Sequence, residues 1–225
     1  ALVNTKLNFN IVSKYPRASM SINEAFNLSL KNLGVEKLYG YLVHHFDFYL
    51  EKPSIYDNMK KLKDEGRIEK IGFSIYTEEQ LQLLLENDVP FDIIQFPYNM
   101  LDRQFEPYMQ KMCEHGVEIH TRSAFLQGLF FKETDKLSDK LKPLKPYLDS
   151  LHDYCTKRNI SIEQLSLGYV VANKYVVGNL IGVDNCNQLE SNIKVIDSKL
   201  EEEDLAFIRS IEVIEKNILN PINWK

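Results

Sequence analysis

The chain has 225 residues and a mass of 26.3 kDa, enough for one large α/β domain or two small ones. Hydrophobic residues make up 44% and charged residues 26%, which excludes a disordered or fibrous protein. The net charge of −5 and the pI near 5.6 argue against nucleic acid as a partner, and no apolar run is long enough for a membrane span or signal peptide. We therefore expect a globular cytoplasmic protein with no nucleic-acid or membrane partner.

The three cysteines of the chain are far apart and odd in number. They are Cys113, Cys155 and Cys186, and none belongs to a CxxC pair. This spacing suits neither a disulfide framework nor a zinc site. We expect reduced thiols, in agreement with a cytoplasmic location.

Short apolar runs alternate with amphipathic helical patterns along most of the chain. In chain order, we predict strands at residues 9–12, 38–43, 70–74, 92–95, 117–120 and 178–181. We predict helices that begin near residues 21, 54, 77, 105, 161, 188 and 202, the last two running to 197 and 214. Ser21, Thr77 and Ser161 each precede a Glu or Gln by three residues, the pattern of a capping box. The first helix is expected to present a stripe of Ala25, Leu28, Leu30 and Leu33.

Strands this apolar, separated by helices, are typical of a parallel sheet that is buried on both faces. Six βα units favour an α/β fold of the (β/α)8 TIM barrel type, whose functional groups lie at the carboxyl ends of the strands. The alternative is an open doubly wound sheet, although no GxGxxG turn follows any strand. Residues 130–154 break the pattern with many lysines and with Pro143 and Pro146. We interpret them as a long surface loop of a single domain covering residues 1–225, rather than as a linker.

The predicted strand ends carry polar side chains where Val or Ile would be usual. They are Ser13-Lys14, His44-His45, Ser74, Gln95, Arg122-Ser123 and the segment from Gly182 onward. Because side chains alternate along a strand, we expect His44 and His45 to point to opposite faces and not to share a metal ion. The other histidines lack ligand spacing, so we predict no metal site. Taken singly, His44 can be a hydrogen-bonded core histidine and Lys14 a solvated lysine.

Taken together and in order, these strand-end motifs resemble the aldo-keto reductase family over about residues 8–215. The motifs are Val12-Ser-Lys14, Leu42-Val-His44, Gly72-Phe-Ser74, Ile94-Gln95, Arg122-Ser-Ala-Phe-Leu-Gln-Gly128 and the run from Ile181 to Asn192. The wording around residues 121–130 looks most like bacterial members associated with surface-polysaccharide sugar metabolism. In the family's order these motifs stand at strands three to eight of the barrel, so about six of eight βα units are present.

The resemblance implies an oxidoreductase in which NAD(P)H passes a hydride to an aldehyde or ketone, possibly a sugar derivative, while a tyrosine donates the proton. A cation beside such a tyrosine lowers its pKa. By resemblance, Lys14 is that cation and His44 orients the carbonyl oxygen. Ser74 and Gln95 match positions that bind the nicotinamide carboxamide. Further cofactor contacts are implied at Arg122, Ser123, Phe125, Gly182, Gln188 and Asn192.

Several positions depart from the family pattern. Ile75 stands where many members carry a second carboxamide-binding Asn, and Arg122 stands where many stack an aromatic ring on the nicotinamide. Arg122 can instead form a salt bridge. At the adenosine end, Asp184 adds negative charge where NADPH-selective members place Lys and Arg. We therefore expect NADH as cofactor, or no strong preference.

The family's catalytic aspartate and tyrosine lie ahead of the lysine strand. Only thirteen residues precede Lys14 here, and none is Asp or Tyr. We expect the natural protein to carry an N-terminal segment ahead of Ala1, and the 225-residue chain to have impaired turnover. The alternatives are a non-catalytic relative that binds nucleotide or a partner, and an unrelated barrel enzyme that uses Lys14 as a Schiff base. Oligomeric state and substrate identity stay open.

Overall fold

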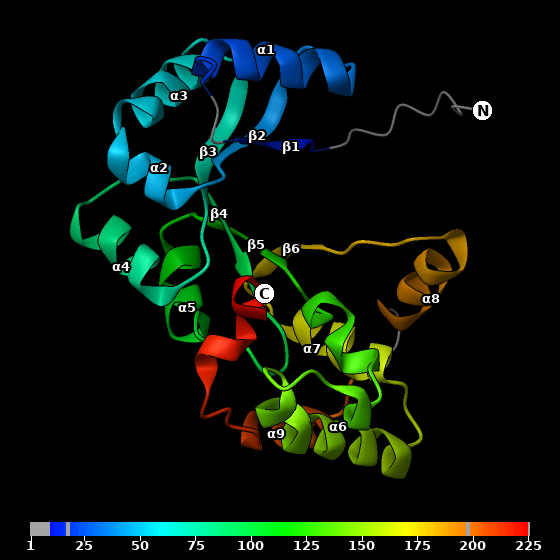
Figure 1. The fold of residues 1–225 in the computed structure, drawn as a ribbon. Coiled ribbons are helices and arrows are strands. Elements are labelled where there is room, and N and C mark those ends of the chain that lie inside the picture. Colours follow the sequence, from blue (N-terminus) through cyan, green and yellow to red (C-terminus); the bar gives the residue numbers. More distant parts are fainter. Residues whose placement is uncertain (1–9, 17–18, 197–198, 225) are drawn as a thin grey trace. The chain divides into compact units, whose positions relative to one another are not determined.

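The computed structural model describes residues 10–16, 19–196 and 199–224 (Figure 1). The strands are β1 (Val12–Tyr15), β2 (Leu38–Val43), β3 (Ile68–Ser74), β4 (Ile93–Pro97), β5 (Glu118–Arg122) and β6 (Val176–Leu180). The helices are α1 (Ile22–Leu33), α2 (Phe46–Glu51), α3 (Ser54–Asp64), α4 (Glu78–Glu86), α5 (Glu106–Glu114), α6 (Lys145–Arg158), α7 (Ile162–Ala172), α8 (Cys186–Ile196) and α9 (Glu202–Ser210). The strands are hydrogen-bonded in the order of the sequence, β1 to β6, and the pairing is parallel from β1 to β4 and between β5 and β6. The predicted parallel α/β sheet is confirmed, and closure into a barrel stays a prediction.

The chain divides into two compact units, and the expected single domain stays a prediction. The first unit comprises residues 1–95 and 116–118, and the second comprises 96–115 and 119–225. In the first unit, α1 and α3 lie side by side over the strands (Figure 1). The rings of Tyr56 and Phe73 stack with centroids 4.6 Å apart, and Phe26 meets Tyr41 edge-on at 5.4 Å. These buried aromatic rings form the core between helices and sheet.

Gly72 allows an unusually close approach of two strands in the first unit. A Cβ atom at this position would lie 1.6 Å from the carbonyl oxygen of Ile93, its register partner on β4. No side chain fits at that distance. The glycine therefore fixes the spacing of β3 and β4, just before the polar residues at their ends.

The capping signals have mixed outcomes. Ser21 forms the predicted capping box, with its N–H donating to Glu24 at 2.8 Å, and Ser161 forms one with Gln164. The box predicted at Thr77 is wrong, because the Thr77 side chain makes no capping hydrogen bond and Gln80 instead accepts from the N–H of Tyr76.

The stripe predicted for the first helix is wrong at Leu28 and Leu33, although Ala25 is buried. Leu28 and Leu33 are 44% and 46% exposed, whereas Ile22, Ala25 and Phe26 are buried. The aromatic ring of Phe26 determines which face of the helix packs on the sheet, since it buries more area than either leucine. The stripe was therefore rotated by about one position.

In the second unit, the segment predicted as a long surface loop contains helix α6. The helix begins at Lys145 and places Pro146 in its first turn, where a missing N–H removes no hydrogen bond. Leu148, Leu151 and Cys155 of this helix are buried. Pro146 therefore starts the helix instead of interrupting it, which corrects the prediction for residues 145–154.

Arg103 ties two segments of the second unit together. Its guanidinium donates to the carbonyl oxygens of Met100, Ile208 and Ile211. The last two belong to the carboxyl end of α9 and the residue that follows it. The acidic run from Glu201 to Asp204 forms the amino end of the same helix, with the Glu201 N–H donating to Asp204 at 2.8 Å.

Other predicted boundaries moved by a few residues. The first strand lies at Val12–Tyr15 instead of 9–12, and Phe9 lies outside the described residues, as does Asp197 at the predicted end of α8. Helix α9 ends at Ser210 instead of Ile214. Across the described residues, no helix is long and apolar enough to cross a membrane.

Candidate active site

Polar side chains gather at the carboxyl ends of β1, β3 and β4 in the first unit. Lys14 lies in β1, Ser74 is the last residue of β3, and Gln95 is the register partner of Ser74 on β4. The Lys14 ammonium donates to the Ser74 hydroxyl at 3.0 Å. The three residues predicted for the site therefore lie on the same side of the sheet, where the strands have their carboxyl ends. Lys14 and Gln95 lie within their strands rather than after them.

Gln95 is the most distinctive member of this group. Its side chain is completely buried, and neither its amide oxygen nor its amide nitrogen has a hydrogen-bond partner among the described residues. A buried, unsatisfied polar group costs roughly 1–3 kcal/mol. An arrangement that leaves both a donor and an acceptor unsatisfied therefore suits a ligand group that is itself an amide.

His44 follows β2 directly, and its N–H donates to the carbonyl oxygen of Tyr15 at 3.2 Å. The expectation that His44 and His45 point to opposite faces is wrong. Their ring centroids lie 4.5 Å apart, because the strand ends at Val43 and His45 begins helix α2. The alternation of side chains therefore does not extend to this pair.

Ile75, directly after Ser74, is part of the packed sheet. Its side chain is completely buried, and its N–H donates to the carbonyl oxygen of Gln95 at 2.8 Å. The backbone of this residue is thus used by the sheet, and its side chain offers no hydrogen bond. Among these strand-end residues, Lys14, Ser74 and Gln95 carry the polar side chains.

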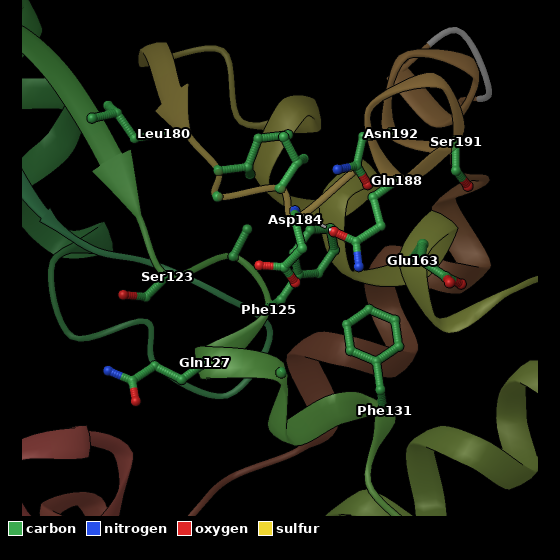
Figure 2. A pocket seen from close by; sticks show the side chains of 15 residues that line it. Ser123, Phe125, Gln127, Phe131, Glu163, Leu180, Asp184, Gln188, Ser191 and Asn192 are labelled. Carbon is green, nitrogen blue, oxygen red and sulfur yellow. Dashed lines mark hydrogen bonds between the residues drawn. The ribbon is translucent and has the colours of Figure 1, made fainter. Parts of the chain in front are cut away.

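The second unit contains a cavity of about 640 Å³ (Figure 2). It brings together five of the six remaining residues predicted to contact a cofactor: Ser123, Phe125, Gly182, Gln188 and Asn192. Ser123 and Phe125 come from the segment after β5, Gly182 from the segment between β6 and α8, and Gln188 and Asn192 from α8 itself. The exception is Arg122, which does not line the cavity although it precedes Ser123.

The wall formed by residues 123–128 has an unusual backbone. Ser123, Leu126 and Gln127 have φ values of 65°, 44° and 51°, in the left-handed region. Two side chains hold this turn in place, since Ser166 donates to the carbonyl oxygen of Ala124 at 2.6 Å and Asn99 donates to that of Ser123 at 3.2 Å. A strained turn that is fixed in this way is typical of binding sites.

The opposite wall is the start of α8. The Asn185 side chain accepts from the N–H of Gln188 at 3.0 Å, and the Gln188 amide oxygen accepts from the N–H of Asp184 at 2.7 Å. Gln188 therefore has a structural role in capping the helix, which leaves its amide nitrogen as the group that a ligand can use. Asn192, one turn further along, is buried.

Two carboxylates also line this cavity. Asp184 stands out in the sequence, but Glu163 does not, because an acid in the first turn of a capped helix is an ordinary complement to the helix dipole. Phe131 and Gln127 are further lining residues that sequence reasoning missed. No spacing signal connects Glu163 to residues 182–192, so only the folded chain shows it.

Arg122 has a separate environment at the end of β5. Its carbonyl oxygen accepts from the N–H of Tyr98 at 3.0 Å, and its positive charge acts on Asp102. Asp102 is only 4% exposed, and burial raises the pKa of its carboxyl to about 6 in spite of a hydrogen bond from Gln104 and the nearby Arg122 and Lys216. The three cysteines are free thiols, and within the described part of the chain no group of three His, Cys, Asp or Glu could hold a metal ion.

Comparison with known proteins identifies the family. The model of the aldo/keto reductase family matches residues 1–213. The chain belongs to the aldo/keto reductase family. The resemblance of the strand-end motifs is thereby confirmed, and Lys14, His44, Ser74 and Gln95 lie inside the matched region.

The chain is similar to several reductases of this family. It is 23% identical over 215 residues to the NADH-specific methylglyoxal reductase of Escherichia coli (strain K12), covering 87% of this chain and 66% of that protein. It is 23% identical over 206 residues to the L-glyceraldehyde 3-phosphate reductase of Escherichia coli O157:H7, covering 80% and 60%. The chain thus spans somewhat less than two thirds of the length of these two aldo-keto reductases.

A solved structure supports the fold. The apo form of an aldo-keto reductase from Bacillus halodurans matches with a TM-score of 0.73 at 22% identity, over 92% of this chain and 73% of that one. This likeness shows that the chain has a fold similar to that of this aldo-keto reductase.

Proposed function

We propose that the protein is an NAD(P)H-dependent reductase of aldehydes or ketones. The observation that carries this proposal is the strand-end group of Lys14, Ser74 and Gln95. A cation, a hydroxyl and an unsatisfied buried amide stand together in a chain that belongs to the aldo/keto reductase family. Each has a chemical role in carbonyl reduction.

Gln95 and Ser74 would hold the nicotinamide end of the cofactor. The carboxamide of nicotinamide has one acceptor and two donors, which complement the amide oxygen and nitrogen of Gln95. Hydrogen bonds to this group orient the ring, and orientation decides which of its faces meets the substrate. When bound, NAD(P)H supplies the hydride.

Lys14 and His44 would act on the carbonyl group. A lysine ammonium favours the ionised form of a neighbouring acid and so lowers the pKa of a proton donor placed beside it. Lys14 is held by the Ser74 hydroxyl, which fixes its ammonium at the sheet edge. His44, a half-buried residue at the end of β2, would orient the carbonyl oxygen.

The cavity of the second unit would hold the adenosine diphosphate end. Its volume of about 640 Å³ lies within the range of ligand pockets, roughly 300–1,000 Å³. Ser123, Gly182, Gln188 and Asn192 line it, with Phe125 as an apolar surface. Arg122 stays a proposed nicotinamide contact, although its place outside the cavity lining gives it no support.

The substrate proposed is a small carbonyl compound, including sugar derivatives. The names of the two similar reductases support this class, since methylglyoxal and glyceraldehyde 3-phosphate are both small aldehydes. The term NADH-specific in the first name agrees with the expected preference for NADH. We also propose a cytoplasmic location and one domain for residues 1–225.

The test is a pair of measurements on the full 225-residue chain. NADH fluorescence should titrate to saturation with a Kd below about 100 μM. Oxidation of NADH with methylglyoxal should be slow, because none of the residues ahead of Lys14 supplies an Asp or Tyr.

Two substitutions sharpen the binding measurement. Gln95→Leu should raise the Kd of NADH at least about tenfold, because two hydrogen bonds to the cofactor are lost. Gln110→Leu, on the exposed face of α5, should leave the Kd of NADH unchanged. Tight binding without any turnover would favour the non-catalytic nucleotide-binding protein. Absence of both binding and turnover in folded protein would refute the cofactor assignment.

A further inference from the structure

The charged side chains that line the cavity of the second unit are both acidic. They are Glu163 and Asp184, and among the described residues that line the cavity there is no lysine or arginine. Figure 2 shows the two carboxylates on different walls, Glu163 from α7 and Asp184 from the segment before α8. A ligand that brings an additional phosphate here meets repulsion without a compensating cation.

Glu163 is the better placed of the two acids. It is the second residue of α7, and the capping box of Ser161 and Gln164 fixes the start of that helix. The helix is anchored by a buried run from Leu165 to Val170. Glu163 therefore projects from a rigid element, as binding groups of defined geometry do.

Within the part of the chain that the structure describes, no cation is paired with the charge of Glu163. Across residues 10–16, 19–196 and 199–224 its carboxylate has neither an ion pair nor a hydrogen bond, and the side chain is half-buried. The amino end of α7 stabilises the negative charge in this position. By contrast, Asp184 is exposed, so water screens its charge more strongly.

We propose that Glu163 makes this cavity select a dinucleotide whose adenosine ribose has a free 2′-hydroxyl, NAD(H), over one with a 2′-phosphate. The proposal rests on the proposed function and adds the residue that sets cofactor choice. A carboxylate accepts hydrogen bonds from ribose hydroxyls, as acidic residues do in other dinucleotide folds, and it repels a phosphate dianion. Both effects act in the same direction.

The experiment compares the Kd values of NADH and NADPH by fluorescence titration of the full chain at low ionic strength. The ratio of the Kd of NADPH to the Kd of NADH should be about ten or more in the wild-type protein. Glu163→Gln should reduce this ratio by about fivefold or more, mainly because NADPH binds more tightly. The control is Glu190→Gln on α8, which removes the same charge from an exposed residue outside the cavity lining. It should leave the ratio unchanged.

Salt provides a readout that a purely structural role would not move. Raising the salt concentration from about 0.05 M to about 0.5 M should reduce the ratio of the Kd of NADPH to that of NADH in the wild type. The same change should have little effect on this ratio in Glu163→Gln.

Three results would overturn the proposal. They are a wild type without preference, a ratio unchanged by Glu163→Gln, and a larger change with Asp184→Asn than with Glu163→Gln. If the wild type binds NADH while the ratio does not respond, only this proposal fails. If folded protein binds neither nucleotide, the proposed function fails together with it.

Discussion

Substitution of Asp102 tests how the protein holds a buried acid beside Arg122. Burial raises the pKa of this carboxyl from 3.8 to about 6. A raised pKa means that the folded protein binds a proton more tightly than the unfolded chain, so ionisation destabilises the fold. Stability is therefore lost as the pH rises from about 4 to about 6. At about 1.4 kcal/mol per pKa unit, the loss is about 3 kcal/mol above pH 6.

Asp102→Asn keeps the shape of the side chain and the acceptor for Gln104 but cannot ionise. The difference in unfolding free energy between this variant and the wild type should grow in favour of the variant by about 3 kcal/mol between pH 4 and pH 7.5. Urea unfolding followed by circular dichroism at several pH values measures it. Asp64→Asn, at the exposed end of α3, reports what removal of a surface charge does. A difference that does not change with pH, or that falls as the pH rises, would refute the reasoning.

Two further substitutions test the fold in each unit. Gly72→Ala should lower the unfolding free energy by about 2 kcal/mol or more, because the new Cβ atom would collide with the carbonyl oxygen of Ile93. The control is Gly178→Ala in β6, where a Cβ atom would lie 3.6 Å from its nearest neighbour. This substitution should lower the unfolding free energy by less than about 1 kcal/mol. Equal effects in chemical unfolding would contradict the close approach of β3 and β4. Arg103→Lys should cost about 1–3 kcal/mol because the lysine cannot reproduce the forked contacts to the end of α9, while Arg209→Lys keeps an exposed ion pair and should be nearly neutral. The melting temperatures of the two variants check this, and equal values would count against the role of Arg103.

Much of the fold follows from local patterns in the sequence. Apolar runs predict all six strands of the parallel sheet, and hydroxyl caps at Ser21 and Ser161 predict two helix starts. The failures have physical causes. Pro146 is typical of a helix end, but it lies in the first turn of α6. In α1 the buried face contains Phe26, and the predicted leucines Leu28 and Leu33 are exposed. These outcomes depend on packing partners that lie far away in the sequence.

Part of the candidate site can likewise be predicted from the sequence, and part of it cannot. The order of the motifs predicts the strand-end group of the first unit and, separately, five of the residues that line the cavity of the second unit. The sequence does not show that Gln95 lacks partners or that Glu163 faces the same cavity as Asn192. Both are properties of the assembled chain. The adjacency of His44 and His45 is another, because it depends on where β2 ends.

The most direct test of the central claim compares NADH with ADP-ribose, which lacks the nicotinamide ring, in calorimetric titrations of the wild type and Gln95→Leu. If Gln95 binds the carboxamide, the substitution should raise the Kd of NADH by about tenfold or more and leave the Kd of ADP-ribose within about twofold. Equal weakening of both ligands, or of neither, would contradict the assignment of the nicotinamide end to the strand-end group.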